Sequence, residues 1–146
     1  MVETENMHIE TVIIEFTTRG YTDIVDITEN TQSVISSSGL QEGNCTLFGI
    51  GSTTGLTTIE YEPGLVKQDL AAMFDHFAPY GRPYAHNMTW GDDNGASHLR
   101  SSLMGTDLSI PFQSGSLILG TWQQIVFVDF DTRPRNRRVV VQLMGK

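Results

Sequence analysis

Two histidines, two adjacent aspartates and an arginine stand close together among glycines in residues 84–123. They are His86, Asp92, Asp93, His98 and Arg100. Glycine lets the backbone approach other groups closely or adopt a positive φ, while histidine, aspartate and arginine supply proton carriers, cation ligands and anion contacts. An apolar core has no use for this mixture. The stretch is therefore typical of a functional site.

The two aspartates stand at the start of a short helix predicted at residues 94–104. The first turn of a helix carries unpaired N–H groups and a partial positive charge, and both favour anions. With Arg100 one turn further on, this region suits a phosphate or a carboxylate. We take His86, His98 and Asp92 as candidate catalytic residues, and Asp93 and Arg100 as candidate substrate contacts. The aspartates suit simple capping of the helix equally well.

The histidines also suggest a metal. His86 and His98 are twelve residues apart, which matches no zinc motif, but two imidazoles and a carboxylate can still meet in space around a divalent ion such as Mg²⁺ or Zn²⁺. Asp92 is one candidate carboxylate. Glu60 is another, because it alternates with Glu62 on one face of a predicted strand, a pattern that an exposed edge strand also produces.

An aromatic ring and an amide follow further along the chain. In residues 120–124, GTWQQ, the side chain of Trp122 stands beside Gln123 and after Thr121. A flat ring next to an amide suits a planar heterocycle. Core and edge positions in a strand account for the same residues.

Composition bounds the class of protein. The chain has 146 residues and a net charge of −8, which suits one domain over residues 1–146 and argues against a nucleic-acid surface. No apolar run reaches the roughly 20 residues of a membrane span. An acidic, polar N-terminal segment and a single cysteine, Cys45, favour a cytoplasmic location.

Periodicity predicts more strands than helices. β-Branched and apolar runs predict strands at 8–16, 24–27, 43–52, 56–62, 108–112, 117–119, 121–131 and 138–144. Helical spacing predicts helices at 28–38, ending at Gly39, and from Pro63 to Pro79. In the predicted helix at 94–104, Leu99 and Leu103 form the apolar stripe. The predicted class is α+β with a largely antiparallel sheet.

The last two predicted strands carry further detail. Strand 121–131 is mostly apolar on both faces, which predicts a central strand covered on its second face by helices or by another subunit. We expect it to form a hairpin with strand 138–144. The arginine-rich connection, RPRNRR, favours a solvated turn over a phosphate-binding patch.

The ordered motifs of the second half resemble a known family. GDDNGASHLRSSLMG, LSIP, GSLILGTWQQIVFVDFD and RRVVVQLMG are similar to the YjbQ-like family of secondary thiamine-phosphate synthases, over residues 9–145. The resemblance implies a compact YjbQ-like fold with a barrel-like sheet and two or three helices. It also implies a homotrimer.

The same resemblance implies an activity. In this family an aminopyrimidine diphosphate is joined to a thiazole phosphate with release of pyrophosphate, regarded as a weak or side activity. His98 and Arg100 match the family element H-[LIV]-[RK], Asp92 and Asp93 match G-D-D, and His86 matches Tyr-x-His. The remaining match is to G-T-W-Q, formed by Gly120, Thr121, Trp122 and Gln123.

One departure from the family pattern bears on the metal. Many members carry a histidine where this chain has Gly51 or Ser52, so Glu60 or Asp92 would have to complete a three-ligand site. Three functions remain open on the sequence. The first is the small-molecule transferase, with Mg²⁺ on the two aspartates and Trp122 stacked on the pyrimidine. The second is a metal-dependent hydrolase of a small phosphorylated or carboxylated metabolite, and the third is a non-catalytic ligand-binding trimer.

Overall fold

The computed structural model describes residues 6–146, which form two antiparallel sheets and several helices. The strands are β1 (His8–Thr18), β2 (Asp23–Asp26), β3 (Gly43–Gly49), β4 (Thr54–Ile59), β5 (Asp107–Gln113), β6 (Ser116–Leu117), β7 (Gln124–Asp129) and β8 (Arg135–Gly145). The helices are α1 (Thr28–Ser38), the π-helical segment η1 (Leu65–Asp69), α2 (Leu70–Phe77), α3 (Ala85–Trp90) and α4 (Gly95–Met104). The predicted α+β class is confirmed. Among these helices, none is long and apolar enough to cross a membrane.

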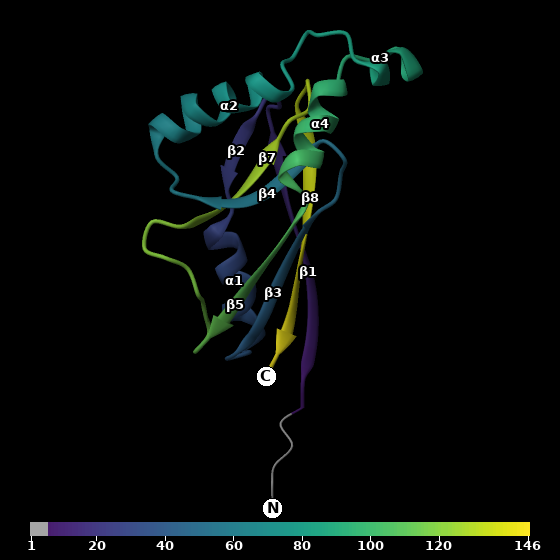
Figure 1. Ribbon diagram of the computed structural model, residues 1–146. Coiled ribbons are helices and arrows are strands. Elements are labelled where there is room, and N and C mark those ends of the chain that lie inside the picture. Colours follow the sequence, from purple (N-terminus) through teal and green to yellow (C-terminus); the bar gives the residue numbers. More distant parts are fainter. Residues whose placement is uncertain (1–5) are drawn as a thin grey trace, which may run out of the picture.

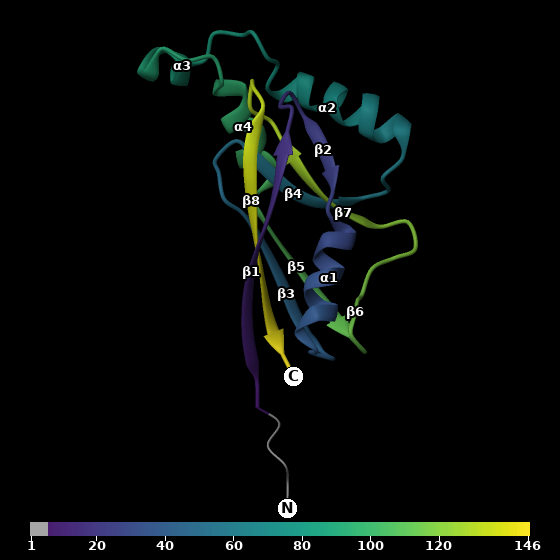
Figure 2. The same cartoon turned by 180° about the vertical axis from the view of Figure 1, so that it is seen from behind.

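The two sheets curl toward each other to give the expected barrel-like shape. The larger sheet has the strand order β1-β8-β3-β5-β6, and the smaller one has the order β2-β7-β4. Figures 1 and 2 show α2, α3 and α4 together at one end of the molecule, while β1 begins and β8 ends at the other. We call these the helical end and the strand end. The candidate residues of α3 and α4 therefore lie at the helical end.

Strand β7 is central and separates two apolar clusters. Ile125 and Phe127 face the main core, between the larger sheet and α1. Val126 and Val128 face a second cluster with Phe74 of α2. The prediction of a central strand covered on both faces is confirmed, and the second cover is helical.

Two predictions about connections are wrong. Strands β7 and β8 do not form a hairpin, because β7 pairs with β2 and β4 while β8 pairs with β1 and β3. The intervening turn is not simply solvated either: the guanidinium of Arg137 makes a bidentate pair with buried Asp129, at 2.6 and 2.8 Å. The expected number of helices is also too low, because α3 was not predicted. Its six residues are too few to show a helical period.

The predicted inner face of α4 is wrong as well. Leu99 and Leu103 are 50% and 60% exposed. The buried face instead carries small residues and Arg100, and the hydroxyl of Ser101 donates a 2.6 Å hydrogen bond to the carbonyl of Thr54 in β4. Small side chains allow this close approach of the helix to the strand.

Cys45 provides a test of the core. Its side chain is fully buried in β3, and burial raises the pKa of its thiol to about 12. Because the thiolate is the reactive form, we expect no modification by a maleimide at pH 8 in the native protein and complete modification in guanidinium chloride. Mass spectrometry measures the modification. Rapid modification of Cys45 in the native protein would contradict this packing.

Candidate functional site

The two histidines of the predicted site lie side by side. Helices α3 and α4 are joined by four residues, and Gly91 ends α3 with a left-handed φ of 68°. This turn places the rings of His86 and His98 with their centroids 4.3 Å apart, at an interplanar angle of 51°. A separation of twelve residues in sequence therefore becomes direct contact, as the metal and acid–base hypotheses both require.

Two carboxylates and an amide adjoin this pair. Nε2 of His86 lies 3.4 Å from Oδ2 of Asp92. One terminal atom of the Asn94 amide is 3.1 Å from the same Nε2, and the other is 3.3 Å from Oδ1 of Asp131. We call these five residues the histidine cluster. The sequence did not single out Asp131, which follows β7 and joins the cluster through long-range packing.

The cluster combines a neutral base with carboxylates. Burial and the neighbouring His86 lower the pKa of His98, against the opposing effects of Asp131, Asp92 and a hydrogen bond to the backbone carbonyl of Ser52. Burial would raise the pKa of Asp131, but hydrogen bonds from Thr132, Asn94 and Arg135 hold it below its usual value. At neutral pH, His98 is thus an uncharged imidazole able to accept a proton or bind a metal.

The residues predicted as metal ligands do not all converge. Within residues 6–146, no three histidine, cysteine or acidic side chains are arranged to hold a metal ion. Glu60 follows Ile59, which pairs with Gln124 at the beginning of β7, whereas Asp131 follows the other end of that strand. Glu60 therefore lies away from the histidine cluster of its own chain.

The aromatic and amide candidates lie with Glu60. Trp122 is in the loop before β7 and is 72% exposed, and Thr121 precedes it in the same loop. The amide of Gln123 donates to Oγ1 of Thr58, at 2.9 Å, and accepts from the N–H of Gly120, at 3.0 Å. One chain thus presents two separate groups of predicted site residues, at the two ends of β7.

Asp93 and Arg100 have different surroundings. Asp93 is exposed and accepts a 2.8 Å hydrogen bond from the hydroxyl of Thr132. Arg100 is only 1% exposed. Its guanidinium donates to the Ala78 carbonyl, to Thr22 and to Asp75 at 2.7–3.0 Å, and its central carbon lies 4.1 Å from the ring centroid of Tyr80. The side chain of Arg100 therefore links α4 to α2 and is shielded from solvent.

This burial predicts a structural effect for Arg100. Because Arg100→Met leaves a buried carbonyl without its donor and removes a cation–π contact, we expect the free energy of unfolding to fall by about 2–4 kcal/mol. The matched control is Arg138→Met, on the exposed face of β8, with a change within about 0.5 kcal/mol. Urea denaturation of both variants measures this. Unchanged stability in Arg100→Met would show that the side chain is held elsewhere.

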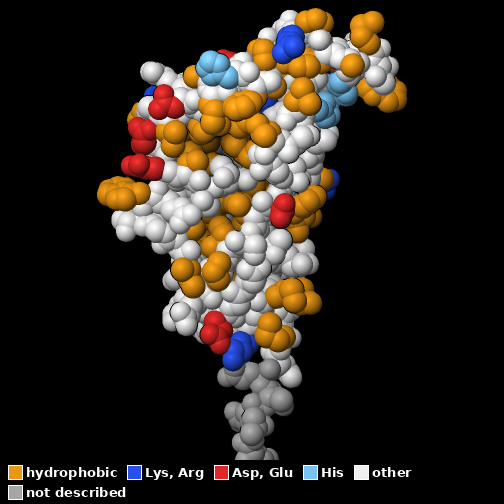
Figure 3. Space-filling model, in the orientation of Figure 1, with side chains coloured by type: hydrophobic (Ala, Val, Ile, Leu, Met, Phe, Trp, Pro, Cys, Tyr) orange, Lys and Arg blue, Asp and Glu red, His pale blue; other side chains and the backbone are white. Residues whose placement is uncertain are grey.

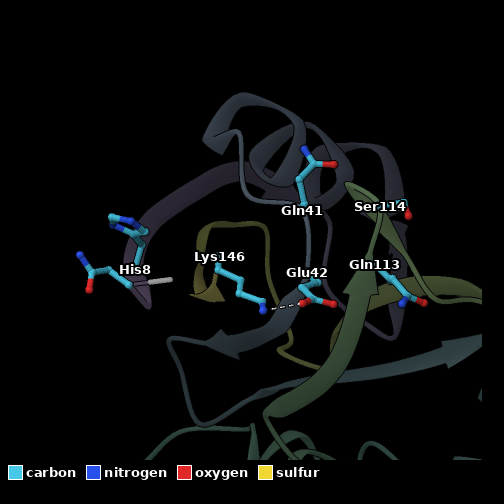
Figure 4. Close-up of a pocket in the computed structure, with 7 residues that line it drawn as sticks. His8, Gln41, Glu42, Gln113, Ser114 and Lys146 are labelled. Carbon is cyan, nitrogen blue, oxygen red and sulfur yellow. Dashed lines mark ion pairs between the residues drawn. The ribbon is translucent and has the colours of Figure 1, made fainter. Parts of the chain in front are cut away.

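A separate hollow lies at the strand end. It has a volume of about 540 Å³ and is lined by polar residues of β1, β5 and the chain before β3. Figure 4 shows Lys146 reaching toward Glu42 across it, with Nζ and Oε1 3.1 Å apart. None of the residues predicted for the site lines it, so the histidine cluster remains the better candidate.

Comparison with known proteins agrees with the fold. The family model described as UPF0047 protein YjbQ-like matches residues 12–146. A UPF0047 protein of Methanothermobacter thermautotrophicus is 36% identical over 140 residues, covering 96% of this chain and 95% of the relative, and one of Archaeoglobus fulgidus is 36% identical over 84% of this chain and 91% of its own. The crystal structure of a YjbQ-like protein of unknown function from Sulfolobus solfataricus superposes with a TM-score of 0.90, at 30% identity, over 97% of this chain and all of that one. The chain belongs to the UPF0047, YjbQ-like family.

Proposed function

We propose that the chain is a transferase that joins an aminopyrimidine diphosphate to a thiazole phosphate and releases pyrophosphate. The observation that carries the proposal is the adjacent pair His86 and His98 beside Asp92. This arrangement places an uncharged imidazole and a carboxylate at one surface. The thiazole nitrogen attacks through its lone pair and has no proton to lose. The substitution therefore requires an anionic ligand for a divalent cation at the leaving pyrophosphate and polar groups that orient the two substrates.

The donor set favours magnesium over zinc. A zinc site uses three or four protein ligands, which the described part of one chain does not assemble. Mg²⁺ needs only one or two carboxylates together with substrate phosphates, and exposed Asp92 fits that need. When bound there, Mg²⁺ would neutralise charge on the leaving pyrophosphate. Neutral His98 would help to orient the substrates through hydrogen bonds, and Asp92 and Asn94 hold His86 beside it.

The proposal includes a homotrimer. The face of β1 that turns away from the core exposes Ile9 and Ile13, and the neighbouring strands add Phe48 and Met144. Trp90 of α3 is also mostly exposed, and Figure 3 shows hydrophobic side chains gathered around the helical end. Burying such surface is the usual reason for association. In a trimer, Glu60 of one subunit can meet the histidine cluster of another. Light scattering should give three times the 16.2 kDa chain mass.

The test of the transferase compares two histidine variants purified in the same way. Wild-type protein and His76→Asn, an exposed position on α2, should form thiamine phosphate from the two substrates with Mg²⁺. His98→Asn should be at least about 100-fold slower, because it removes a group that positions the substrates. Product is measured by oxidation to a fluorescent thiochrome and by pyrophosphate release. Equal trace rates in all three proteins would identify a contaminant and reject the proposal.

The two alternatives give different results in the same assay. A hydrolase would release phosphate from the pyrimidine substrate without the thiazole, and that release would depend on His98. A non-catalytic binding trimer would bind the pyrimidine with no turnover, and binding would survive His98→Asn. Measuring both products and binding therefore separates the three functions.

A further inference from the structure

A hollow of about 470 Å³ lies beside the histidine cluster and shares Asp92 with it. Its other charged or aromatic lining residues are Tyr21, Tyr80, Arg82, Tyr84 and Asp93. We propose that this hollow binds a planar amino-heterocycle that carries a phosphate, with the ring against Tyr21, the amino group toward Asp93 and the phosphate toward Arg82. The choice of an aminopyrimidine as this ligand rests on the proposed function.

The aromatic wall is fixed by unusual backbone geometry. Tyr21 and Thr22 both have left-handed φ values, 52° and 66°, which cost about 1–2 kcal/mol each outside glycine. Hydrogen bonds from their N–H groups to the carbonyls of Asp131 and Asp129, at 2.7 and 2.8 Å, hold the turn. Gly20 precedes it with a φ of 84°, and a Cβ there would lie 2.6 Å from the carbonyl oxygen of Asp131. Strain of this kind gathers at functional sites, and here it keeps the ring of Tyr21 56% exposed at the hollow.

The other two tyrosines are anchored by their hydroxyl groups. Tyr80 donates to the Phe130 carbonyl at 2.6 Å, and Tyr84 donates to the Pro79 carbonyl at 2.7 Å. The rings of Tyr21 and Tyr80 meet edge to face, with centroids 5.0 Å apart and an interplanar angle of 68°. Because these contacts keep the rings rigid, little side-chain entropy is lost when a ligand binds against them.

The charges of the hollow select the ligand. Arg82 is exposed, and its guanidinium carbon lies 5.9 Å from the ring centroid of Tyr84. Asp93 is held by the hydroxyl of Thr132, and Asp92 adjoins His86. The hollow therefore offers Arg82 as the cation for an anionic group, Asp93 as a carboxylate for an amino group, and aromatic rings for a flat ring. A ligand with a flat ring, an amino group and a phosphate satisfies all three.

This placement differs from stacking on Trp122, which the sequence predicted. Trp122 precedes β7, whereas Tyr21 is hydrogen-bonded to Asp131, beyond the opposite end of that strand. Within one chain, Tyr21, Tyr80 and Tyr84 form the aromatic surface of the hollow beside the histidine cluster, and we call them the tyrosine wall. Replacing Tyr21 and Trp122 in turn therefore tests which of the two rings stacks on the ligand.

The experiment measures binding of an aminopyrimidine monophosphate by calorimetry. This probe lacks the diphosphate leaving group, so binding is separated from turnover. We expect Tyr21→Leu to weaken binding about tenfold, as for loss of one stacked base, Tyr21→Phe to retain it, and Trp122→Leu to leave it unchanged. Arg82→Gln should weaken binding of the phosphate ester but not of the corresponding alcohol, and circular dichroism confirms that each variant folds.

Two results would overturn the proposal. One is absence of probe binding to the wild type at millimolar concentration. The other is loss of binding in Trp122→Leu with retention in Tyr21→Leu. Failure of the transferase assay with Tyr21-dependent binding intact would reject the proposed reaction and leave the binding site standing.

Discussion

Replacing Asp129 with alanine should lower the free energy of unfolding by about 3–5 kcal/mol, the usual cost of removing one partner of a buried ion pair. The carboxylate of Asp129 is fully buried. It accepts two hydrogen bonds from Arg137, one from the hydroxyl of Thr18 and one from the N–H of Asp131. The variant leaves the guanidinium of Arg137, whose side chain is only 10% exposed, with only the more distant carboxylate of Asp131, at 3.7 Å. Thermal and urea denaturation measure the change.

Two further variants identify the cause of this loss. Asp107→Ala removes an exposed aspartate from β5 and should change stability by less than about 0.5 kcal/mol. Combining Asp129→Leu with Arg137→Met removes both charges and should recover much of the loss, because no buried charge then lacks a partner. If Asp129→Ala lowers the free energy of unfolding by less than about 1 kcal/mol, the ion pair between β7 and β8 does not stabilise the fold as described.

The periodic elements could be predicted from sequence because their pattern is local. The alternation along β7 assigned Ile125 and Phe127 to one face and Val126 and Val128 to the other, and both assignments are confirmed. The helix over residues 28–38 and its end at Gly39, with a φ of 75°, are also confirmed. In each case the side-chain spacing or the glycine decides the structure without help from distant residues.

Long-range pairing could not be predicted in the same way. The ion pair between Asp129 and Arg137 connects a strand of the smaller sheet to one of the larger, whereas the sequence offered only a basic turn. Arg100 was predicted to contact substrate, yet its acceptors come from Thr22, Asp75 and Ala78. These partners are distant in sequence, so no local pattern records them.

The candidate site contains features of both kinds, some set by local sequence and some by long-range packing. Glycines among polar groups drew attention to His86 and His98, and the short turn at Gly91 explains why they meet. The tyrosine wall carried no such signal, since Tyr21 reaches it through a strained turn near the N-terminal strand. Residue types thus indicated the two histidines, while the proposed aromatic surface depends on how separate segments pack.

Replacing Ser52 with histidine should create a zinc site. The ring of His98 donates a hydrogen bond to the backbone carbonyl of Ser52, so an imidazole at position 52 would adjoin His98 and, through it, His86. Three neutral imidazoles form a common zinc ligand set, and the lowered pKa of His98 favours the neutral form that binds metal. We expect zinc affinity to rise by on the order of 100-fold over the wild type.

Calorimetry with zinc and thermal denaturation measure this gain together. Zinc at about 100 times its dissociation constant should stabilise Ser52→His by about 2.7 kcal/mol. The control Ser33→His places the new imidazole on α1, in the helix that packs on the main core, and should gain nothing. Adding His98→Asn to Ser52→His should abolish the gain, since only two imidazoles then remain at the site. If the wild type and Ser52→His bind zinc equally tightly, the histidine cluster already has a third ligand. Glu60 of a neighbouring subunit is then the first residue to replace in a search for that ligand.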